Sequence, residues 1–437
     1  MLVIGNVIGI GIFTTAGYVA GKVGSPAEFF LIWILGGFYA LFGALTYAEL
    51  ASRFPLAGGD YHYLKQAYHP LLGFLFGWAA FMVTYTGSIA TIAVGFATYF
   101  LNLLPESIRV AEYRFSGLFP PLTAGKSVAI LVVLMLTVVN TRGLRKGAFL
   151  QNIFTVSGIL ILVGTATWGF STGNGSFSHF QPFWSSADGS AGLDTIGLAL
   201  LGVIFTYSGW TVVVYIAGEV REPAKNIPGA MAGAIALIMA LYLLMNAVYL
   251  YAFPLPEMKD VVDIGFRTLT KLAGSPVGGF FSLLIMLAVL STLNANILSG
   301  PRIYYAMARE NRFFRWAGEL NPKRQIPEKG LWMQFAWTVL LIYSGTFNQL
   351  LTYTVFAMVL FSFLSAVSLF VLRAKGKNKS AAYRIWGYPV VPGAFCLAAG
   401  AITLNTFFGR PLVALTGMGI ILTGIPFFYY WRKRREV

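Results

Sequence analysis

The sequence has 437 residues, of which 57% are hydrophobic and only 11% are charged, and its net charge is +15. Soluble domains carry about 25% charged residues, so the composition excludes an ordinary soluble protein and indicates an integral membrane protein. A positive charge can indicate nucleic-acid binding, but the positive-inside rule explains it better in a membrane protein. We therefore expect the protein to be embedded in a lipid bilayer and to bind no nucleic acid.

Apolar stretches recur along the whole chain. A helix needs roughly 20 apolar residues to cross a bilayer, and the sequence predicts about twelve such helices and no soluble domain. They lie near residues 2–21, 27–52, 70–103, 124–140, 148–171, 194–217, 228–253, 276–309, 331–346, 349–373, 389–408 and 411–431. The first stretch lacks the basic residues that open a cleaved signal peptide, so we expect it to be a retained helix.

The distribution of basic residues predicts the orientation. If both termini are cytoplasmic, the inner loops carry most of the 31 Lys and Arg, above all within 302–329, 373–384 and 432–435. Cytoplasmic loops are enriched in these residues, and an even number of spans agrees. The sequence thus predicts a multi-pass protein of the plasma or inner membrane. Its single cysteine, Cys396, lies in a predicted span, so we expect no disulfide-linked partner.

Two predicted spans are interrupted at matching places. The first interruption is Ile-Gly-Ile-Gly-Ile-Phe at 8–13, and the second is Phe-Thr-Tyr-Ser-Gly-Trp at 205–210. An interrupted helix leaves backbone N–H and C=O groups unpaired, which a membrane tolerates only where they are buried in protein or line a cavity. Paired interruptions of this kind indicate the binding site of a transporter.

The interruptions also predict the internal organisation of one transmembrane domain, 1–437. The chain divides into two five-helix units, 1–171 and 194–373, and a trailing helix pair, 389–431. Each interruption lies in the first helix of its unit. Because a unit with an odd number of spans ends on the opposite side of the membrane, the second unit would be inverted relative to the first.

The ends of interrupted helices can bind a zwitterion, because free N–H groups attract a carboxylate and free carbonyls attract an ammonium. We expect the amides of Ile10, Gly11 and Ile12 to bind the carboxylate. The carbonyls expected to bind the ammonium are those of Val7, Ile8, Phe205 and Ser208. The predicted substrate-binding residues are Val7, Ile8, Gly9, Ile10, Gly11, Ile12, Phe205, Thr206, Ser208 and Gly209. The alternative is helix packing, since Gly5 and Gly9 fit a GxxxG motif.

The same residues resemble a known family. Residues 9–13 (Gly-Ile-Gly-Ile-Phe) resemble the GxGIF signature of the amino acid–polyamine–organocation (APC) superfamily, and 205–210 look like the unwound sixth helix of its L-type amino acid transporter branch. The stretches 47–61, 218–228 and 301–309 also match. The resemblance covers essentially the whole chain. It implies an all-α LeuT-type fold, with a 5+5 inverted repeat and discontinuous helices 1 and 6, and secondary transport of amino acids.

The resemblance also implies roles for single residues. Phe205 would be a gate that covers the substrate. Ser291 and Thr292 lie where Na⁺-coupled relatives of this fold place hydroxyl ligands, and with the Val7 and Ile8 carbonyls they are a candidate cation site. The alternative for both hydroxyls is ordinary hydrogen bonding within or between helices. We expect no cofactor other than this possible Na⁺.

Two positions depart from the family pattern. Many relatives have serine between the two glycines of the first signature, where this chain has Ile10. Many also carry a lysine in the fifth helix that serves as a proton carrier or replaces a cation. The matching position here is Gly158, so Gly158 is the predicted coupling position and the usual coupling is not expected.

No acidic side chain, Lys or Arg maps to the middle of a predicted span, and all three His map to loops. A cationic substrate would be buried without an acidic partner at a cost of several kcal/mol, so we expect a substrate with an uncharged side chain. The lack of a proton carrier favours exchange, facilitated diffusion or Na⁺ coupling over proton symport. No set of groups that could supply a nucleophile, base or metal site is present, so we expect no enzyme and no bound metal.

Four polar residues in or near the predicted spans are expected to form structural contacts. We expect Glu49 and Glu219 to pair with inner-loop Arg or Lys and to act as latches on the cytoplasmic side. We expect Asn246 and Asn294 to form hydrogen bonds between helices.

These observations predict a permease or exchanger that moves small-to-medium neutral L-amino acids by alternating access. One alternative is an antiporter of cationic amino acids or polyamines. An alternative of another class is a membrane sensor that binds an amino acid without moving it.

Overall fold

The computed structural model describes the chain except for residue 1 and residues 55–57, 114–120, 143–146, 185–191, 216–219, 377–382 and 434–437. The described part is almost entirely helical. Its one small sheet pairs β1 (Glu112–Tyr113) with β2 (Leu122–Thr123) in antiparallel fashion, and Glu112 lies opposite Thr123. The expected all-α architecture is confirmed.

The helices follow one another along the whole chain. They are α1 (Leu2–Val7), α2 (Gly11–Ala20), α3 (Pro26–Arg53), α4 (Asp60–Ala67), α5 (Pro70–Ala79), the π-helix η1 (Ala80–Thr84), α6 (Tyr85–Leu101), α7 (Glu106–Arg109), α8 (Ala124–Thr141), α9 (Gly147–Ser171), the 3-10 helix η2 (Phe177–Phe180), α10 (Leu193–Tyr207), α11 (Val212–Tyr215), α12 (Pro223–Ala252), α13 (Leu255–Met258), α14 (Ile264–Ala273), α15 (Ser275–Arg309), the 3-10 helix η5 (Arg315–Gly318), α16 (Glu328–Ser344), α17 (Phe347–Ala374), α18 (Val390–Gly409), α19 (Pro411–Leu422) and α20 (Gly424–Lys433).

Eight helices among the described residues are long and apolar enough to cross a membrane. They are Pro26–Arg53, Pro70–Leu101, Ala124–Thr141, Ala224–Ala252, Ser275–Arg309, Phe347–Ala374, Val390–Gly409 and Pro411–Arg432. Each of the other predicted spans also contains helix, but in a shorter piece. The first and sixth are divided by their interruptions, α16 has only 17 residues, and the fifth is described at full detail only over Thr155–Ser171. Twelve crossings therefore remain a prediction.

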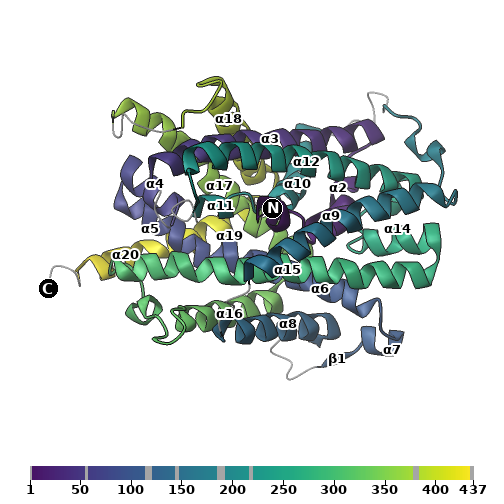
Figure 1. The fold of residues 1–437 in the computed structure, drawn as a ribbon, viewed down its shortest axis with the longest axis horizontal. Coiled ribbons are helices and arrows are strands. Elements are labelled where there is room, and N and C mark those ends of the chain that lie inside the picture. Colours follow the sequence, from purple (N-terminus) through teal and green to yellow (C-terminus); the bar gives the residue numbers. More distant parts are fainter. Residues whose placement is uncertain are drawn as a thin grey trace.

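The interrupted helices lie in the interior of the bundle (Figure 1). Helices α3 and α12 pack against each other along one edge, and α8 and α16 pack together along the opposite edge. Between these pairs, α2 packs against α10, and α1 packs against α9 and α12. The two interruptions are thereby enclosed by continuous helices.

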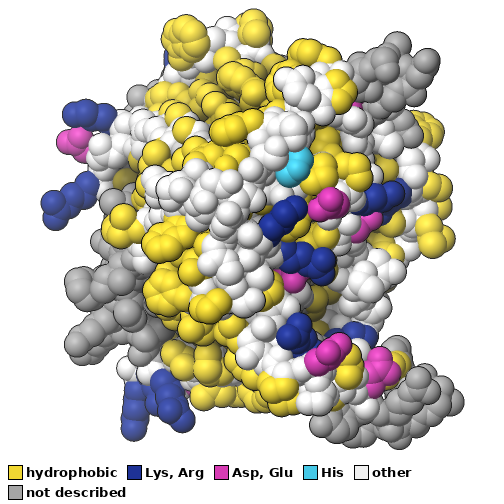
Figure 2. Space-filling model, turned by 90° about the vertical axis from the view of Figure 1, so that its right-hand side faces the viewer, with side chains coloured by type: hydrophobic (Ala, Val, Ile, Leu, Met, Phe, Trp, Pro, Cys, Tyr) yellow, Lys and Arg dark blue, Asp and Glu magenta, His cyan; other side chains and the backbone are white. Residues whose placement is uncertain are grey.

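The two ends of the molecule differ in the elements that form them. We name them the α4 end, where α4, the start of α5 and α20 lie, and the α14 end, where α7 and α14 lie (Figure 1). Figure 2 looks onto the α14 end, where acidic and basic side chains lie close together among hydrophobic ones. At the α4 end, Arg373 binds Glu49 and Lys65 binds Glu310. Basic residues from the ends of several helices thus meet at one end.

The outer faces of the last helices are apolar. Leu397, Phe408 and Leu412 on α18 and α19 are each 77% exposed. Exposing such large apolar side chains to water is unfavourable, but exposing them to the hydrocarbon core of a bilayer is not. A helix that faces lipid needs no polar face, because its backbone groups are bonded within the helix. The exposed surface of α18 and α19 therefore agrees with an integral membrane protein.

Candidate functional site between the interrupted helices

The first interruption leaves a set of backbone amides unpaired. Helix α1 ends at Val7 and α2 begins at Gly11, so residues 8–10 are not helical. No described residue accepts a hydrogen bond from the amides of Gly9, Ile10, Gly11 or Ile12. The first backbone bond inside α2 runs from Phe13 N–H to the Ile10 carbonyl over 3.0 Å. These amides form the positive end of the α2 dipole, which favours an anionic ligand.

The second interruption lies three residues later than predicted. Helix α10 continues through Tyr207, residues 208–211 are not helical, and α11 begins at Val212. Phe205 and Thr206 therefore lie in the last turn of α10, and the expectation that they are unwound is wrong. The physical cause is Gly209, whose φ of +109° only glycine adopts readily. The chain leaves the helix just before this residue.

Glycines allow the two interruptions to touch. A Cβ on Gly209 would lie 2.6 Å from the carbonyl oxygen of Asn6, and a Cβ on Gly11 would lie 2.7 Å from the Cα of Thr206. The hydroxyls of Thr15 and Thr206 are hydrogen-bonded at 2.5 Å. The backbone that flanks the first interruption thus lies directly against the backbone at and beside the second one.

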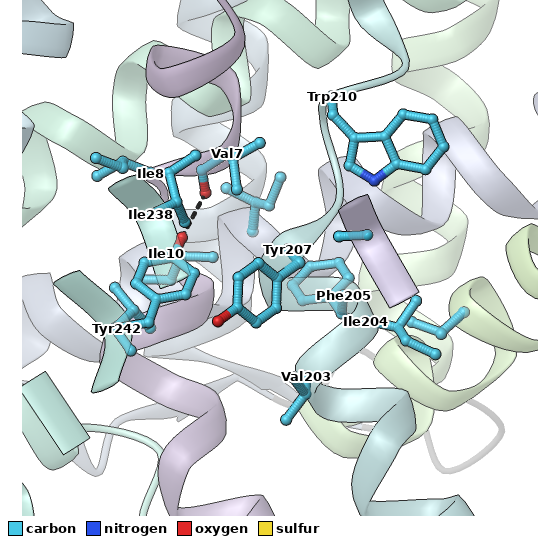
Figure 3. Close-up of a cluster of buried hydrophobic side chains, with 14 of the residues drawn as sticks. Val7, Ile8, Ile10, Val203, Ile204, Phe205, Tyr207, Trp210, Ile238 and Tyr242 are labelled. Atoms are coloured by element: carbon cyan, nitrogen blue, oxygen red, sulfur yellow. Dashed lines mark hydrogen bonds between the residues drawn. The ribbon is translucent and has the colours of Figure 1, made fainter. Parts of the chain in front are cut away.

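Tyr242 on α12 links both interruptions and was not predicted. Its hydroxyl donates to the Val7 carbonyl over 2.8 Å and lies 3.3 Å from the Thr206 carbonyl. Figure 3 shows the bond to Val7, with Tyr207 beside it. In the sequence Tyr242 lies within an apolar run, and nothing local distinguishes it from the other tyrosines of the chain, which number 22 in all. Only the packing of α12 against α1 brings it to the site.

A cavity opens between the interruptions, with about 950 Å³ of empty space that includes its open mouth. Most predicted substrate-binding residues line it, namely Val7, Gly9, Ile10, Gly11, Phe205, Thr206, Ser208 and Gly209. Ile8 and Ile12 do not line it. Ile12 is fully buried, and its carbonyl accepts a hydrogen bond from Tyr249. The role of the lining residues in binding remains a prediction.

Asn6 also lines the cavity and was missed by the sequence reasoning. Its side chain is 4% exposed, and neither its Oδ1 nor its Nδ2 has a hydrogen-bond partner among the described residues. A buried amide that forms no bond is unfavourable by about 1–3 kcal/mol. Such a group beside a cavity is well placed to bond a polar ligand.

Comparison with known proteins decides the family. A sequence model of the amino acid permease family matches residues 1–430. The chain belongs to the amino acid permease family. The resemblance that residues 9–13 and 205–210 suggested is confirmed at this level.

Curated relatives align with this permease along almost its whole length. The serine/threonine exchanger SteT of Bacillus subtilis (strain 168) is 27% identical over 444 residues, which cover 99% of the permease and 95% of the relative. The Asc-type amino acid transporter 1 of Mus musculus is 29% identical, with 99% and 80% covered. The large neutral amino acids transporter small subunit 2 of Homo sapiens is 28% identical, with 99% and 79% covered. These names indicate transporters rather than enzymes.

The predicted cation ligands are only partly brought together. The Thr292 hydroxyl donates to the Ile8 carbonyl over 3.3 Å, so two of the four predicted ligands are adjacent. The Val7 carbonyl instead accepts from Tyr242. Ser291 is buried, at 5% exposure. No group of three or more metal-ligating His, Cys, Asp or Glu side chains occurs among the described residues.

The predicted coupling position lies beside the first interruption. Gly158 is on α9, and a Cβ there would be 3.1 Å from Cγ2 of Ile8. The packing of α9 against α1 accounts for this proximity. A longer side chain at 158 would thus start next to residues 8–10. Its effect on coupling remains a prediction.

The cavity extends toward the α4 end, where it reaches a carboxylate. Asp60, the first residue of α4, is 3% exposed, lines the cavity and accepts a hydrogen bond from Tyr47 over 2.6 Å. The sequence predicted only that Asp60 lies outside the middle of a span, which its place at the start of α4 confirms, and it assigned Asp60 no part in the site. The chain around 58–60 turns inward through Gly58 and Gly59, both at positive φ. His62, expected in a loop, also lies on α4.

At the α4 end, Glu49 holds three chain segments together. Its fully buried carboxylate accepts hydrogen bonds from Arg53 at 2.6 and 2.9 Å, from Arg373 at 2.9 Å and from the Ile385 amide at 2.9 Å. The expected pairing of Glu49 with arginine is confirmed, although Arg53 and Arg373 lie in the last turns of α3 and α17 rather than in a loop, and the cytoplasmic placement of this end remains a prediction. The role of Glu49 as a latch also stays a prediction, and Glu219 lies outside the described residues.

The two asparagines behave differently from each other. Asn294 accepts a hydrogen bond from Asn140 of α8 over 2.7 Å, which confirms the expected bond between helices. Asn246 donates to the Tyr242 carbonyl of its own helix, also over 2.7 Å. The expectation of an interhelical bond is therefore wrong for Asn246, because its amide turns back along α12.

Proposed function

We propose that this permease is a secondary transporter that exchanges small-to-medium neutral L-amino acids across the cell membrane. The observation that carries the proposal is the meeting of two interrupted helices at one cavity. The unpaired amides of Gly9, Ile10 and Gly11 complement a carboxylate, and the carbonyl ends of α1 and α10 complement an ammonium. The names of the relatives, which include serine/threonine, Asc-type and large neutral amino acid transporters, support the same substrate class.

Apart from Asp60, which lies at the α4 end and is bonded by Tyr47, the described residues that line the cavity are uncharged and support a neutral side chain on the substrate. Thr84, Ser88 and Asn296 contribute polar groups, and Ile92 and Met358 contribute apolar ones. A mixed lining of this kind suits small polar and medium apolar side chains. The antiporter of cationic amino acids or polyamines and the non-transporting sensor are not favoured by the relatives.

Contacts of α2 support alternating access. At the α14 end, the Asp260 amide bonds the Gly17 carbonyl over 2.9 Å and the Tyr99 hydroxyl bonds the Phe13 carbonyl over 2.6 Å. The cavity reaches Asp60 at the opposite end. This conformation is closed toward the α14 end. With the proposed twelve spans, inverted repeat and cytoplasmic termini, it is an inward-facing state, and transport alternates it with an outward-facing one.

Exchange is the proposed mode, and Na⁺ coupling is the alternative to test. If Na⁺ is bound, Thr292 and the Ile8 carbonyl would hold it with Ser291, and its charge would balance the substrate carboxylate. In the exchange mode, Gly158 leaves the region beside Ile8 without a fixed cation. Phe205, which lines the cavity at 6% exposure, is the proposed gate.

The test is uptake of radiolabelled serine, alanine and leucine into proteoliposomes. Vesicles are prepared with and without internal amino acid, in Na⁺ and in Na⁺-free buffer. We expect uptake that requires internal amino acid and is indifferent to Na⁺. Lysine and putrescine serve as the cationic competitors.

Each other outcome points to a different mechanism. Uptake into empty vesicles that depends on Na⁺ would replace exchange by Na⁺ symport and make Ser291 and Thr292 ligands. Competition by lysine or putrescine would support the cationic alternative. Binding measured by calorimetry without any flux would support the sensor.

A further inference from the structure

A basic and aromatic groove lies at the α4 end, away from the central cavity. It is formed where the start of α5, the end of α15 and the end of α20 meet. Its lining residues are His69, Pro70, Asn311, Arg312, Phe428, Trp431 and Arg432. Two guanidinium groups and a histidine thus surround one hollow, and none of the described residues that line it is acidic.

The end of α15 fixes the position of Arg312. Asn311 has a φ of +56°, its amide bonds the Ala308 carbonyl over 3.0 Å, and the Arg312 amide bonds the Met307 carbonyl over 2.9 Å. This pair of bonds is a Schellman motif, with asparagine in the left-handed position. The motif ends the helix and turns Arg312 toward α20. The placement of Arg312 is therefore set by backbone geometry.

The floor of the groove is aromatic. Phe428 and Trp431 are 4% and 7% exposed. The Arg312 guanidinium carbon lies 5.9 Å from the centre of the Phe428 ring, and the His69 ring lies 6.3 Å from it. The Leu71 amide donates to Nδ1 of His69 over 3.1 Å, so Nε2 carries the proton of the neutral ring and is a donor. The hollow thus combines an apolar floor with hydrogen-bond donors.

The Glu310 carboxylate lies close enough to Arg312 to interact with it electrostatically, but the two side chains form no ion pair. The Nη1 of Arg312 is buried and has no hydrogen-bond partner, and Arg312 forms no ion pair with a described residue. The neighbouring carboxylate, Glu310, is bonded by Lys65 at 2.8 Å and by Tyr61 at 2.6 Å. A guanidinium group in a partly buried, aromatic hollow is strongly stabilised by a bidentate anion such as phosphate.

The surroundings of the groove identify the source of the anion. On α20, Phe427, Tyr429 and Tyr430 are 39%, 55% and 51% exposed, and this helix ends the candidate span Pro411–Arg432. Aromatic residues followed by basic ones mark the level of lipid headgroups at the end of a span. We propose that this groove binds the phosphate of an anionic phospholipid. The proposal does not depend on which substrate is transported.

The experiment measures lipid binding to the purified full-length protein in a neutral detergent. Phosphatidylglycerol, phosphatidylcholine and inorganic phosphate are titrated separately, and bound lipid is counted by native mass spectrometry beside the thermal unfolding midpoint. We expect phosphatidylglycerol to bind and to raise the midpoint, and phosphatidylcholine to do neither. Arg312→Gln should weaken binding of phosphatidylglycerol about tenfold.

Two further variants keep the test independent of folding. Arg432→Gln changes an exposed residue of the groove and should also weaken binding, whereas Arg315→Gln changes an exposed arginine outside it and should bind as the wild type does. Equal binding of the two phospholipids, or unchanged binding in both groove variants, would overturn the proposal. Stabilisation by inorganic phosphate alone, with displacement of the lipid, would also overturn it in favour of a soluble anion.

Discussion

The hydroxyl of Tyr242 donates a hydrogen bond of 2.8 Å to the carbonyl of Val7, the last helical residue before the first interruption. The same hydroxyl lies 3.3 Å from the Thr206 carbonyl near the second interruption. The single hydroxyl proton bonds the nearer Val7 carbonyl more strongly than the Thr206 carbonyl. Tyr242 is therefore a contact that can pass from one interrupted helix to the other when they move.

Tyr242→Phe should slow transport more than it destabilises the protein. Loss of one buried hydrogen bond lowers the free energy of unfolding by about 1 kcal/mol. We expect the maximal rate of uptake to fall several-fold, because the bond joins the moving elements. The matched control is Tyr304→Phe, whose hydroxyl bonds the Ala80 carbonyl and Gln334, neither of which belongs to an interruption. Equal loss of transport in both variants would contradict the role given to Tyr242.

Gly11→Ala should disrupt the site, because its Cβ would lie 2.7 Å from backbone of Thr206. We expect a loss of about 1–3 kcal/mol in the free energy of unfolding, as for other overpacked positions, and no measurable uptake. Gly9→Ala should be milder, since the three atoms nearest to its Cβ all belong to the Thr292 side chain, and Thr292→Ala should partly restore uptake. Thermal unfolding of the purified variants shows whether Gly11→Ala is the most destabilising, Gly9→Ala is less so, and the addition of Thr292→Ala restores stability.

Gly164 on α9 provides the control for this series. A Cβ there meets no atom within 4 Å. Gly164→Ala should leave uptake unchanged and keep or raise the unfolding midpoint, because alanine favours a helix over glycine. If Gly164→Ala and Gly11→Ala were equally damaging, close approach of the interruptions would not be the cause.

The glycines show what the sequence could predict about the site. Gly9 and Gly11 marked the first interruption, because two glycines within an apolar run leave backbone groups exposed to a ligand. The end of α10 was placed three residues too early. Phe205 and Thr206 have no local signal to separate them from 208–211, and the boundary depends on the positive φ of Gly209.

Residues brought in from other elements could not be predicted. Tyr242 and Asp60 reach the site only through tertiary contacts. Tyr242 is placed by the packing of α12 against α1, and Asp60 is held by a hydrogen bond from Tyr47. Asn6 lies one residue outside the region that the sequence assigned to binding. Its importance follows from its burial without a partner, and burial is a property of the folded chain.

Asn6→Ala should raise the KM for uptake by about tenfold, the cost of one lost hydrogen bond to a charged group. Because both polar atoms of Asn6 lack partners, its removal should not lower the unfolding midpoint. The comparison is Asn140→Ala, which removes a 2.7 Å bond to Asn294. It should lower the midpoint and leave KM unchanged. A lower midpoint with unchanged KM for Asn6→Ala would show a structural role instead.

The Glu310 pair should make stability depend on pH. Burial alone would raise the pKa of Glu310, but the hydrogen bonds from Lys65 and Tyr61 outweigh burial and hold the pKa below its usual 4.5. A carboxyl with a lowered pKa stabilises the fold above its unfolded pKa, and the contribution disappears as pH falls through the folded value. Glu310→Gln should therefore lower the unfolding midpoint at about pH 7 but not at about pH 3.

The control for pH is Glu257→Gln. Glu257 pairs with Lys271 at 3.7 Å, but its side chain is 57% exposed. Exposed pairs contribute little, so this variant should match the wild type at both pH values. A pH-independent effect of Glu310→Gln would indicate that packing rather than charge is lost.

A lysine at Gly158 tests the coupling proposal most directly. The Cβ of Gly158→Lys would lie 3.1 Å from Cγ2 of Ile8, so its ammonium can reach the carbonyl end of α1 without crossing the cavity. A fixed positive charge there would replace a mobile cation. If the permease is Na⁺-coupled, the lysine should abolish the Na⁺ dependence while uptake persists. If it is an exchanger, uptake should stay independent of Na⁺, and the affinity for the substrate carboxylate should rise.

Gly158→Met separates charge from bulk in this experiment. Methionine has nearly the length of lysine but no charge, and its flexible chain can fit beside Ile8. In proteoliposomes with and without Na⁺, the methionine variant should keep the Na⁺ dependence and substrate affinity of the wild type. Only the lysine variant should change them. Identical behaviour of the two variants would mean that position 158 acts through packing.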